Sequence, residues 1–331
     1  MPKTPLSLSQ VHELVSRVLL RYGCNGDNAE SIAKTITAAE RDGSESHGLF
    51  RLPGYVASLR SGKVNGDAVP FLRKKTEAVL EVDANNGFAP NALRVGLPQL
   101  VIAAESIGIA VMSLRNTYHF SALWPETEFL AERGLVGIAC TNYVPTVAPV
   151  GGVEKFFGTN PLSFSWPRKN KSPVCFDMAT SAMSLGDVQI AARDGKTLPK
   201  GVGLDAHFQD TFDPKGILEG VLLPFGGYKG SLISMMVELL SAGLTGDVFS
   251  YEAKECDNGD GGPVIGAELV MAINPSVIAS GDWQQHSEEF FNKLSAIEGV
   301  RLPGLRRHRF RENRKMIEVD TVLLETINNL L

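Results

Sequence analysis

The 331-residue sequence contains few cysteines and no long hydrophobic run. Its four cysteines lie far apart without a Cys-x-x-Cys pair, which argues against a zinc cluster, a redox pair or a disulfide framework. The most apolar stretch, 101–114, is interrupted by Glu105 and Gly108, and the N-terminus shows no apolar segment of the signal-peptide type. We therefore expect a cytoplasmic protein with no membrane partner.

Motifs of common nucleotide and metal enzymes are also missing. No Gly-x-Gly-x-x-Gly follows a predicted strand, and neither the P-loop pattern Gly-x-x-x-x-Gly-Lys-[Ser/Thr] nor His-Glu-x-x-His occurs. With 32 Lys and Arg against 37 Asp and Glu, the net charge of -5 argues against nucleic acid as a partner. Segment 301–315 is the exception, because seven cations and one anion there indicate a local anion site.

The residues that are present predict a globular α/β protein. Capping boxes at Ser7-x-x-Gln10 and Asp27-x-x-Glu30 predict two helices, and a third is expected over 48–59, before a polar boundary at 60–66. Beyond it, strands are predicted at 78–82, 109–112, 135–140, 162–166, 174–176 and 269–273. Helices expected at 91–107, 123–134, 181–194, 230–243 and 283–296 separate several of them, an alternation typical of α/β folds, and the Gly-rich 252–263 segment is predicted to be a mobile loop.

The first candidate site is the junction between the second and third helices. His47 and Arg51 are four residues apart, so if the third helix begins near His47 both side chains project from one helical face. An imidazole can transfer a proton near neutral pH, and a guanidinium can hold a carboxylate through two hydrogen bonds. The alternative is a helix N-terminus with polar capping residues.

Four more segments carry candidate chemistry. His119 lies in an aromatic loop after a strand, where ligands of α/β sheets bind, although a buried turn explains it equally well. The run 176–183, with Asp187 beyond it, could present backbone N–H groups to a phosphate, or Asp187 could be a solvated helix carboxylate. The turn 223–231 offers Lys229 to an anion or serves as a hinge, and 302–309 offers arginines to a 2′-phosphate or forms a solvated face.

Taken together, the motifs resemble the type 2 malate/L-lactate dehydrogenase superfamily, whose dinucleotide-binding fold differs from the Rossmann fold. The resemblance is closest to bacterial Δ1-piperideine-2-carboxylate/Δ1-pyrroline-2-carboxylate reductases. It rests on Ser-His-Gly-Leu-Phe-Arg at 46–51, His-Phe-Ser-Ala-Leu-Trp-Pro at 119–125, Phe-Gly-Thr-Asn-Pro at 157–161, Phe-Asp-Met-Ala-Thr-Ser-Ala-Met at 176–183, Gly-Asp-Val-Gln-Ile-Ala-Ala-Arg at 186–193, Asp-Pro-Lys at 213–215 and Leu-Leu-Pro-Phe-Gly-Gly at 222–227.

The resemblance implies specific roles for these residues. His47 would be the proton donor, with Ser46 and Asp187 in a relay, while Arg51 and Thr159 would bind the substrate carboxylate. We expect Asp187 to raise the pKa of His47. The implied cofactor contacts are His119, Phe120, Ser121, Ala122, Leu123, Asp177, Met178, Ala179, Tyr228, Lys229, Leu302, Pro303, Gly304, Leu305, Arg306, Arg307 and His308.

Two departures bear on the cofactor. The related reductases carry His-His-Phe where this chain has Tyr118-His119-Phe120, and Gly-Gly-His-Lys-Gly where this chain has Gly-Gly-Tyr-Lys-Gly at 226–230. A tyrosine side chain, unlike a histidine ring, does not become a cation, so Tyr228 would not present a cationic ring to a phosphate. NADPH remains the expected cofactor, with NADH as a weaker alternative, and no metal is expected.

The expected activity is NADPH-dependent hydride transfer to the C=N bond of a small cyclic imine acid by a homodimer. A 2-oxoacid reductase of the malate, lactate, sulfolactate or ureidoglycolate type remains the main alternative. A hydrolase built on Ser46, His47 and Asp187 lacks the Gly-x-Ser-x-Gly motif, and a non-catalytic dinucleotide-binding protein is the third reading. The expected organisation is a helical segment 1–62 packed with 281–331, a dimerisation and substrate part 63–118, and a cofactor-binding domain 119–280.

Overall fold

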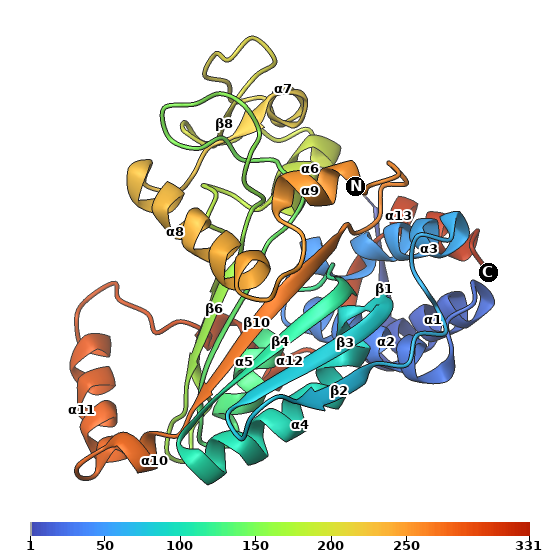
Figure 1. The fold of residues 1–331 in the computed structure, drawn as a ribbon. Coiled ribbons are helices and arrows are strands. Elements are labelled where there is room, and N and C mark those ends of the chain that lie inside the picture. Colours follow the sequence, from blue (N-terminus) through green and yellow to red (C-terminus); the bar gives the residue numbers. More distant parts are fainter. Residues whose placement is uncertain (1) are drawn as a thin grey trace.

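A seven-stranded mixed sheet forms the centre of the computed structural model, which describes residues 2–331 (Figure 1). Its strand order is β2 (Phe71–Lys74), β3 (Val79–Phe88), β4 (Ile109–Tyr118), β10 (Ile265–Ile273), β5 (Val136–Thr141), β6 (Leu162–Trp166) and β7 (Val174–Met178). Strands β3 and β4 pair in parallel, whereas the other neighbours in this sheet pair antiparallel. The α/β class predicted from the sequence is confirmed.

Alternating side chains give the sheet two apolar faces. Val270 and Ala272 of β10 pack toward the cluster that includes α4 (Ala89–Ile107) and α5 (Trp124–Ala131). Leu269, on the opposite face of the same strand, packs with Val237 of α8 (Tyr228–Glu238). Because successive side chains of a strand point to opposite faces, one strand serves both layers.

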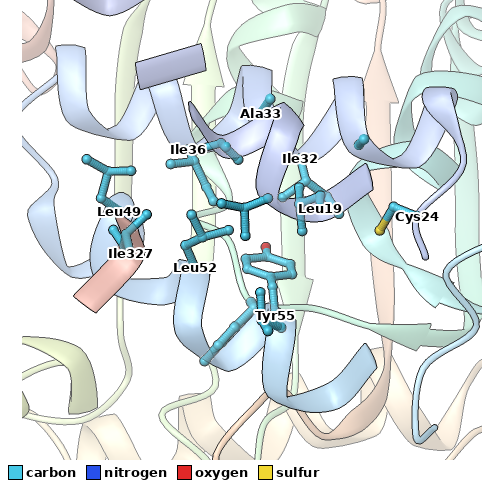
Figure 2. Close-up of a cluster of buried hydrophobic side chains, with 14 of the residues drawn as sticks. Leu19, Cys24, Ile32, Ala33, Ile36, Leu49, Leu52, Tyr55 and Ile327 are labelled. Atoms are coloured by element: carbon cyan, nitrogen blue, oxygen red, sulfur yellow. The ribbon is translucent and has the colours of Figure 1, made fainter. Parts of the chain in front are cut away.

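The N-terminal helices and the C-terminal end of the chain form a second core beside the sheet (Figure 1). Strand β1 (Lys3–Ser7) pairs antiparallel with β11 (Met316–Asp320), which leads into α13 (Thr321–Asn328). The helices α1 (Leu8–Arg21), α2 (Gly26–Arg41) and α3 (Leu52–Ser61) complete the layer. Figure 2 shows how Leu19, Ile32, Ile36, Leu52 and Tyr55 of this core converge.

The helix starts follow local side-chain chemistry. The capping box predicted at Ser7 and Gln10 is present, with both reciprocal hydrogen bonds. The second helix begins one residue after Asn25, whose side chain accepts from the backbone N–H of Asn28 at 2.9 Å. The expected N-cap at Asp27 is therefore wrong, because the earlier Asn25 already caps the helix.

The remaining elements lie mainly at the two ends of the central sheet (Figure 1). They include the short 3₁₀ helices η1 (Glu45–His47) and η2 (Leu49–Arg51), α6 (Leu185–Asp194), β8 (Gly203–Leu204), α7 (Pro214–Glu219), β9 (Val221–Leu222), the π-helical segment η3 (Leu239–Gly243), α9 (Ser250–Glu255), α10 (Pro275–Ile278), α11 (Trp283–Ser295) and α12 (Leu305–Asn313). Of these, α6, α7, β8 and α9 lie at one end of the sheet, and α10 and α11 lie at the other. Within the described residues, no helix is long and apolar enough to cross a membrane.

The segment 252–263, expected to be a mobile loop, is helical over 252–255 and irregular beyond, as a loop would be. Its first part belongs to α9, and the ammonium of Lys63 contacts the carboxylates of Asp257 and Asp260 at 2.8 and 2.6 Å. Lys63 is almost completely buried, so this ion pair joins the segment to the end of α3. The predicted domain boundaries remain a hypothesis, and strands from both 63–118 and 119–280 share the central sheet.

Candidate active site

His47 and Arg51 lie on two successive 3₁₀ helices rather than on one α-helix. Gly48 separates them with an extended backbone (φ -94°, ψ -140°). The third helix predicted over 48–59 is present as α3 but begins only at Leu52, so the expectation that His47 and Arg51 share one helical face is wrong. The carboxylate of Glu40 on α2 occupies the space beside Gly48 and accepts a hydrogen bond from the backbone N–H of Leu49 at 2.7 Å. Despite this break, both functional side chains line one small pocket.

The guanidinium of Arg51 is oriented by neutral groups. Its Nε donates to the backbone oxygen of Ser46 at 2.7 Å, and Nη1 lies 3.4 Å from Oε1 of Gln189. The ring of Phe120 stacks on the guanidinium, with 4.5 Å from ring centre to Cζ. Among residues 2–331, no carboxylate forms an ion pair with Arg51. This half-buried cation therefore retains its capacity to bind an anionic ligand.

The imidazole of His47 is neutral in this structure at physiological pH. Burial, followed by the charges of Arg51 and His119, lowers the pKa of His47 to about 3. Its Nδ1 lies 3.1 Å from Oγ of Ser46. The expectation that Asp187 raises this pKa is wrong, because burial and, after it, the charges of Arg51 and His119 lower the pKa and, within the described chain, no hydrogen bond joins Asp187 to His47.

Asp187 nevertheless opens onto the same space as His47. It lies in the first turn of α6, where its backbone N–H donates to Oγ of the N-cap Ser184 at 3.1 Å. This cap makes the helix begin at Leu185, four residues later than the predicted window 181–194. The side chains of Ser46, His47 and Asp187 all line one large pocket.

Two connected pockets define the site. The small one, about 60 Å³, is lined by His47, Arg51, Thr159 and Tyr143, among others. The large one measures about 560 Å³ and shares His47 and Thr159 with the first. The site therefore combines a small compartment that contains Arg51 with a larger one that has room for a second, bigger molecule.

The predicted cofactor contacts separate into three groups. Eight line the large pocket, namely Ser121, Ala122, Leu123, Asp177, Met178, Ala179, Arg306 and Arg307. His119 and Phe120 line the small pocket instead, and Ser121 borders both. Leu302, Pro303, Gly304 and Leu305 line a neighbouring cavity of about 470 Å³ that shares Arg306 with the large one.

Four of the predicted cofactor contacts either lie outside the two site pockets on an exposed surface or pack against a structural partner. Tyr228 and Lys229 are exposed at the start of α8 and line neither site pocket. His308 is buried, with Nε2 3.0 Å from the carbonyl oxygen of Pro173. Leu302 packs in an apolar cluster with Val174.

Asp177 fixes the loop that forms one wall of the large pocket. Its Oδ2 accepts hydrogen bonds from the backbone N–H groups of Leu123 and Trp124 at 2.8 and 3.1 Å. Burial, opposed in part by these bonds, raises the pKa of Asp177 to about 6. The residue thus joins β7 to the start of α5.

The basic segment 301–315 is partly neutralised within the fold. Arg311 pairs with Asp42 and Glu128, and Arg307 donates to the backbone oxygen of Cys175 at 2.8 Å. Arg306, in contrast, is exposed at the rim of the large pocket. The donor set of this pocket, small residues on one wall and a guanidinium at the rim, fits a phosphate-bearing dinucleotide.

Some functional contacts were not predicted from the sequence. Glu40 and Tyr143 reach the site from elements distant in the chain, and no quoted motif contains them. Gln189 lies in the quoted block 186–193, but its contact with Arg51 follows only from the fold. Gly186 belongs to a motif block that the resemblance used, but its proximity to Arg51 follows only from the fold.

Comparison with known proteins agrees with this geometry. Residues 6–328 match the malate/L-lactate dehydrogenase family model. The chain is 46% identical over 310 residues to a Δ1-pyrroline-2-carboxylate reductase of Ancylobacter novellus, covering 93% of this chain and 91% of that protein. It is 45% identical over 305 residues to a Δ1-pyrroline-2-carboxylate/Δ1-piperideine-2-carboxylate reductase of Pseudomonas putida, covering 92% and 89%.

A solved structure extends the comparison to the fold. The crystal structure of Δ1-piperideine-2-carboxylate reductase from Pseudomonas syringae superposes with a TM-score of 0.94 at 42% identity, covering 99% of this chain and 100% of that chain. Together with the fold and the paired pockets, these matches show that the chain belongs to the malate/L-lactate dehydrogenase family of nicotinamide-dependent oxidoreductases.

Proposed function

We propose that the protein is an NADPH-dependent reductase that converts Δ1-piperideine-2-carboxylate to L-pipecolate and Δ1-pyrroline-2-carboxylate to L-proline. The observation that carries this proposal is the unpaired guanidinium of Arg51 beside His47 in a small pocket that opens into a large one. The names of relatives at 45–46% identity give the proposal its substrate class.

The substrate carboxylate would bind to Arg51. Phe120 and the backbone oxygen of Ser46 already hold the guanidinium in one orientation, so little side-chain entropy is lost on binding. Thr159, which lines both pockets, would contact the carboxylate from the other side. A carboxylate fixed in this way holds the adjacent ring carbon about 3 to 3.5 Å from a hydride donor, the distance required for reaction.

His47 would supply the proton to the imine nitrogen. In the free protein its pKa is lowered to about 3, in part by the charge of Arg51. A carboxylate bound to Arg51 offsets that charge, so substrate binding itself raises the pKa of His47 toward the range of a useful acid. Ser46, 3.1 Å from Nδ1, would orient the ring, and Asp187 would complete the relay when the large pocket is filled.

The cofactor would lie in the large pocket, where it supplies the hydride. Residues 121–123 and 177–179 would contact it, and Arg306 would bind the 2′-phosphate that distinguishes NADPH from NADH. Tyr228 replaces the histidine of the related reductases and carries no charge toward a phosphate. We therefore infer a preference for NADPH that depends mainly on Arg306, with NADH as the weaker cofactor.

We also infer a cytoplasmic homodimer. Helix α8 and the start of η3 expose Leu232, Met235, Met236 and Leu239, each at least 40% accessible. An exposed apolar row of this kind is typical of a subunit interface. Light scattering would test the dimer, and a monomer at micromolar concentration would exclude it.

One substrate panel tests the proposed activity. Oxidation of NADPH and NADH is measured with Δ1-pyrroline-2-carboxylate, Δ1-piperideine-2-carboxylate, pyruvate and oxaloacetate. We expect the highest kcat/KM with a cyclic imine acid and NADPH. A higher value with either 2-oxoacid would assign the same pocket to carbonyl reduction and overturn the proposal.

A further inference from the structure

A buried cluster of three titratable side chains lies behind the small pocket. His119 follows β4, Glu126 lies on α5 and Glu268 on β10, and their exposed fractions are 6%, 3% and 0%. The Nε2 atom of His119 lies 3.4 Å from Glu268 and 3.9 Å from Glu126. One ligand-type atom from each residue lies within 4.8 Å of the other two.

The polar atoms of this cluster lack hydrogen-bond partners among the described residues. Nε2 of His119, Oε2 of Glu126 and both side-chain oxygens of Glu268 are buried and unpartnered. Two ionised carboxylates without a cation would be very costly in such a site. The cluster therefore has to hold at least one proton, and the imidazole of His119, 3.4 and 3.9 Å from the two carboxylates, is the group placed to carry it as a cation.

Charges from every side act on His119. Glu268, Glu126 and Asp177 raise its pKa against the effect of burial. Burial raises the pKa of Glu268, the charge of His119 opposes this rise, and the charges of Glu126 and Asp177 add to it. Cys140 is a further titratable neighbour. His119 and His47 both line the small pocket, and the charge of His119 lowers the pKa of His47. The site thus holds two imidazoles with opposite preferences: the His119 ring tends to keep a proton, and the His47 ring tends to release one.

We propose that Glu268 and Glu126 keep a proton on His119, and that this proton reloads His47 across the small pocket during turnover. His119 lines that pocket together with His47 and Arg51. Glu268 and Glu126 touch neither bound molecule in this account, so they are positioning residues that act through His119. This inference rests on the proposed imine reduction.

The proton balance of one turnover is closed. The hydride of NADPH adds to the imine carbon, the C=N π bond breaks, and its electron pair forms an N–H bond with the proton of His47. His119 then returns a proton to His47, and water supplies the proton that restores the cluster. Each imine therefore consumes one NADPH and one proton, as the overall reduction requires.

The test compares the pH dependence of kcat/KM in wild type and Glu268→Gln, with Glu81→Gln as the matched control. Glu81 is also a largely buried glutamate, but it lies on β3 and pairs with Lys75 outside the pockets. Removing the charge of Glu268 lowers the pKa of His119, since an opposite charge at this distance shifts a pKa by about 1 to 3 units. In the pH profile of kcat/KM, we expect the alkaline limb for Glu268→Gln to lie at least one pH unit lower than for wild type, with near-wild-type activity at pH 6. Glu81→Gln should keep the wild-type profile.

A second measurement does not require a folded variant. Nitrogen-15 spectra of the histidines in the wild-type holoenzyme should show the His119 ring protonated on both nitrogens at pH 7. Three results would each overturn the proposed role of His119 in reloading His47. They are a neutral His119 ring, an equal loss of activity at all pH values in Glu268→Gln, and a strict requirement for a divalent cation. If wild type reduces no imine, the proposed function fails, and the spectrum still decides the protonation of the cluster.

Discussion

Gly186 lies directly against the guanidinium of Arg51. A Cβ atom at position 186 would lie 2.5 Å from Nη2 of Arg51 and 3.0 Å from Cβ of Ser46. Since atoms do not approach so closely, any side chain at this position must displace the arginine, and the glycine is required for close packing rather than for backbone freedom.

The substitution Gly186→Ala should therefore impair substrate binding. A displacement of the guanidinium by about 1 Å is expected to lower kcat/KM for the imine acid by up to ~100-fold, mainly through KM. Gly26→Ala is the control, because a Cβ at residue 26 meets no atom within 4 Å. Equal kinetics for Gly186→Ala and wild type would exclude the role assigned to Arg51.

His47→Asn should lower kcat by about 10²- to 10⁴-fold, the usual contribution of a general acid. The dissociation constant of NADPH, measured by fluorescence titration, should stay close to the wild-type value, because His47 is placed at the reacting end of the site. His286→Asn, an exposed histidine on α11, is the matched control. A turnover number near that of wild type in His47→Asn would show that His47 is not the proton donor.

Glu40 should make the stability of the protein depend on pH. Burial, reinforced by the charge of Glu45 and opposed by the Leu49 hydrogen bond, raises the pKa of Glu40 from 4.5 to about 7. A carboxyl whose pKa is higher in the folded state binds its proton more tightly there, so stability is lost as pH rises from about 4.5 to 7. This loss should reach about 3 kcal/mol.

The variant Glu40→Gln tests this dependence, since its amide oxygen can still accept from Leu49 but cannot ionise. Urea unfolding at pH 5 and pH 8 should show a smaller decrease in the free energy of unfolding for Glu40→Gln than for wild type. If the free energy of unfolding decreased by the same amount between pH 5 and pH 8 in both proteins, Glu40 would already be ionised at pH 5.

Arg306→Ala should weaken the binding of NADPH more than the binding of NADH. Loss of a charged hydrogen bond to a phosphate costs about 1.5 to 3 kcal/mol, so KM for NADPH should rise about 10- to 100-fold, whereas KM for NADH should change little. Arg309→Ala provides the control, because Arg309 is an exposed arginine of the same helix that lines neither site pocket. An equal effect of Arg306→Ala on both cofactors would contradict recognition of the 2′-phosphate.

Local patterns predicted the regular elements better than the site. The strands around 109–112, 135–140 and 269–273 are present because apolar runs of this length bury both faces of a central strand. The helix expected over 48–59 begins only at Leu52, after a break at Gly48 where Glu40, from another helix, fills the adjacent space. A contact between distant segments of this kind leaves no periodic signal.

The electrostatics of the site depend even more strongly on the fold. His47, Arg51 and Asp187 could be selected from motifs, but the direction of the His47 pKa shift depends on His119 and on burial. Glu268 directly precedes the strand predicted at 269–273, no sequence motif marks it, and its partners come from two other elements. The resemblance identified the chemistry, and the structure was needed to find which charges control it.

A crystal structure with NADPH and pyrrole-2-carboxylate, a planar ring acid that does not accept a hydride, tests most directly whether Arg51 and His47 bind the substrate. We expect the ligand carboxylate on the guanidinium of Arg51, the ring nitrogen within hydrogen-bond distance of His47, and the nicotinamide in the adjoining large pocket. A carboxylate bound elsewhere, with Arg51 unoccupied, would contradict this assignment.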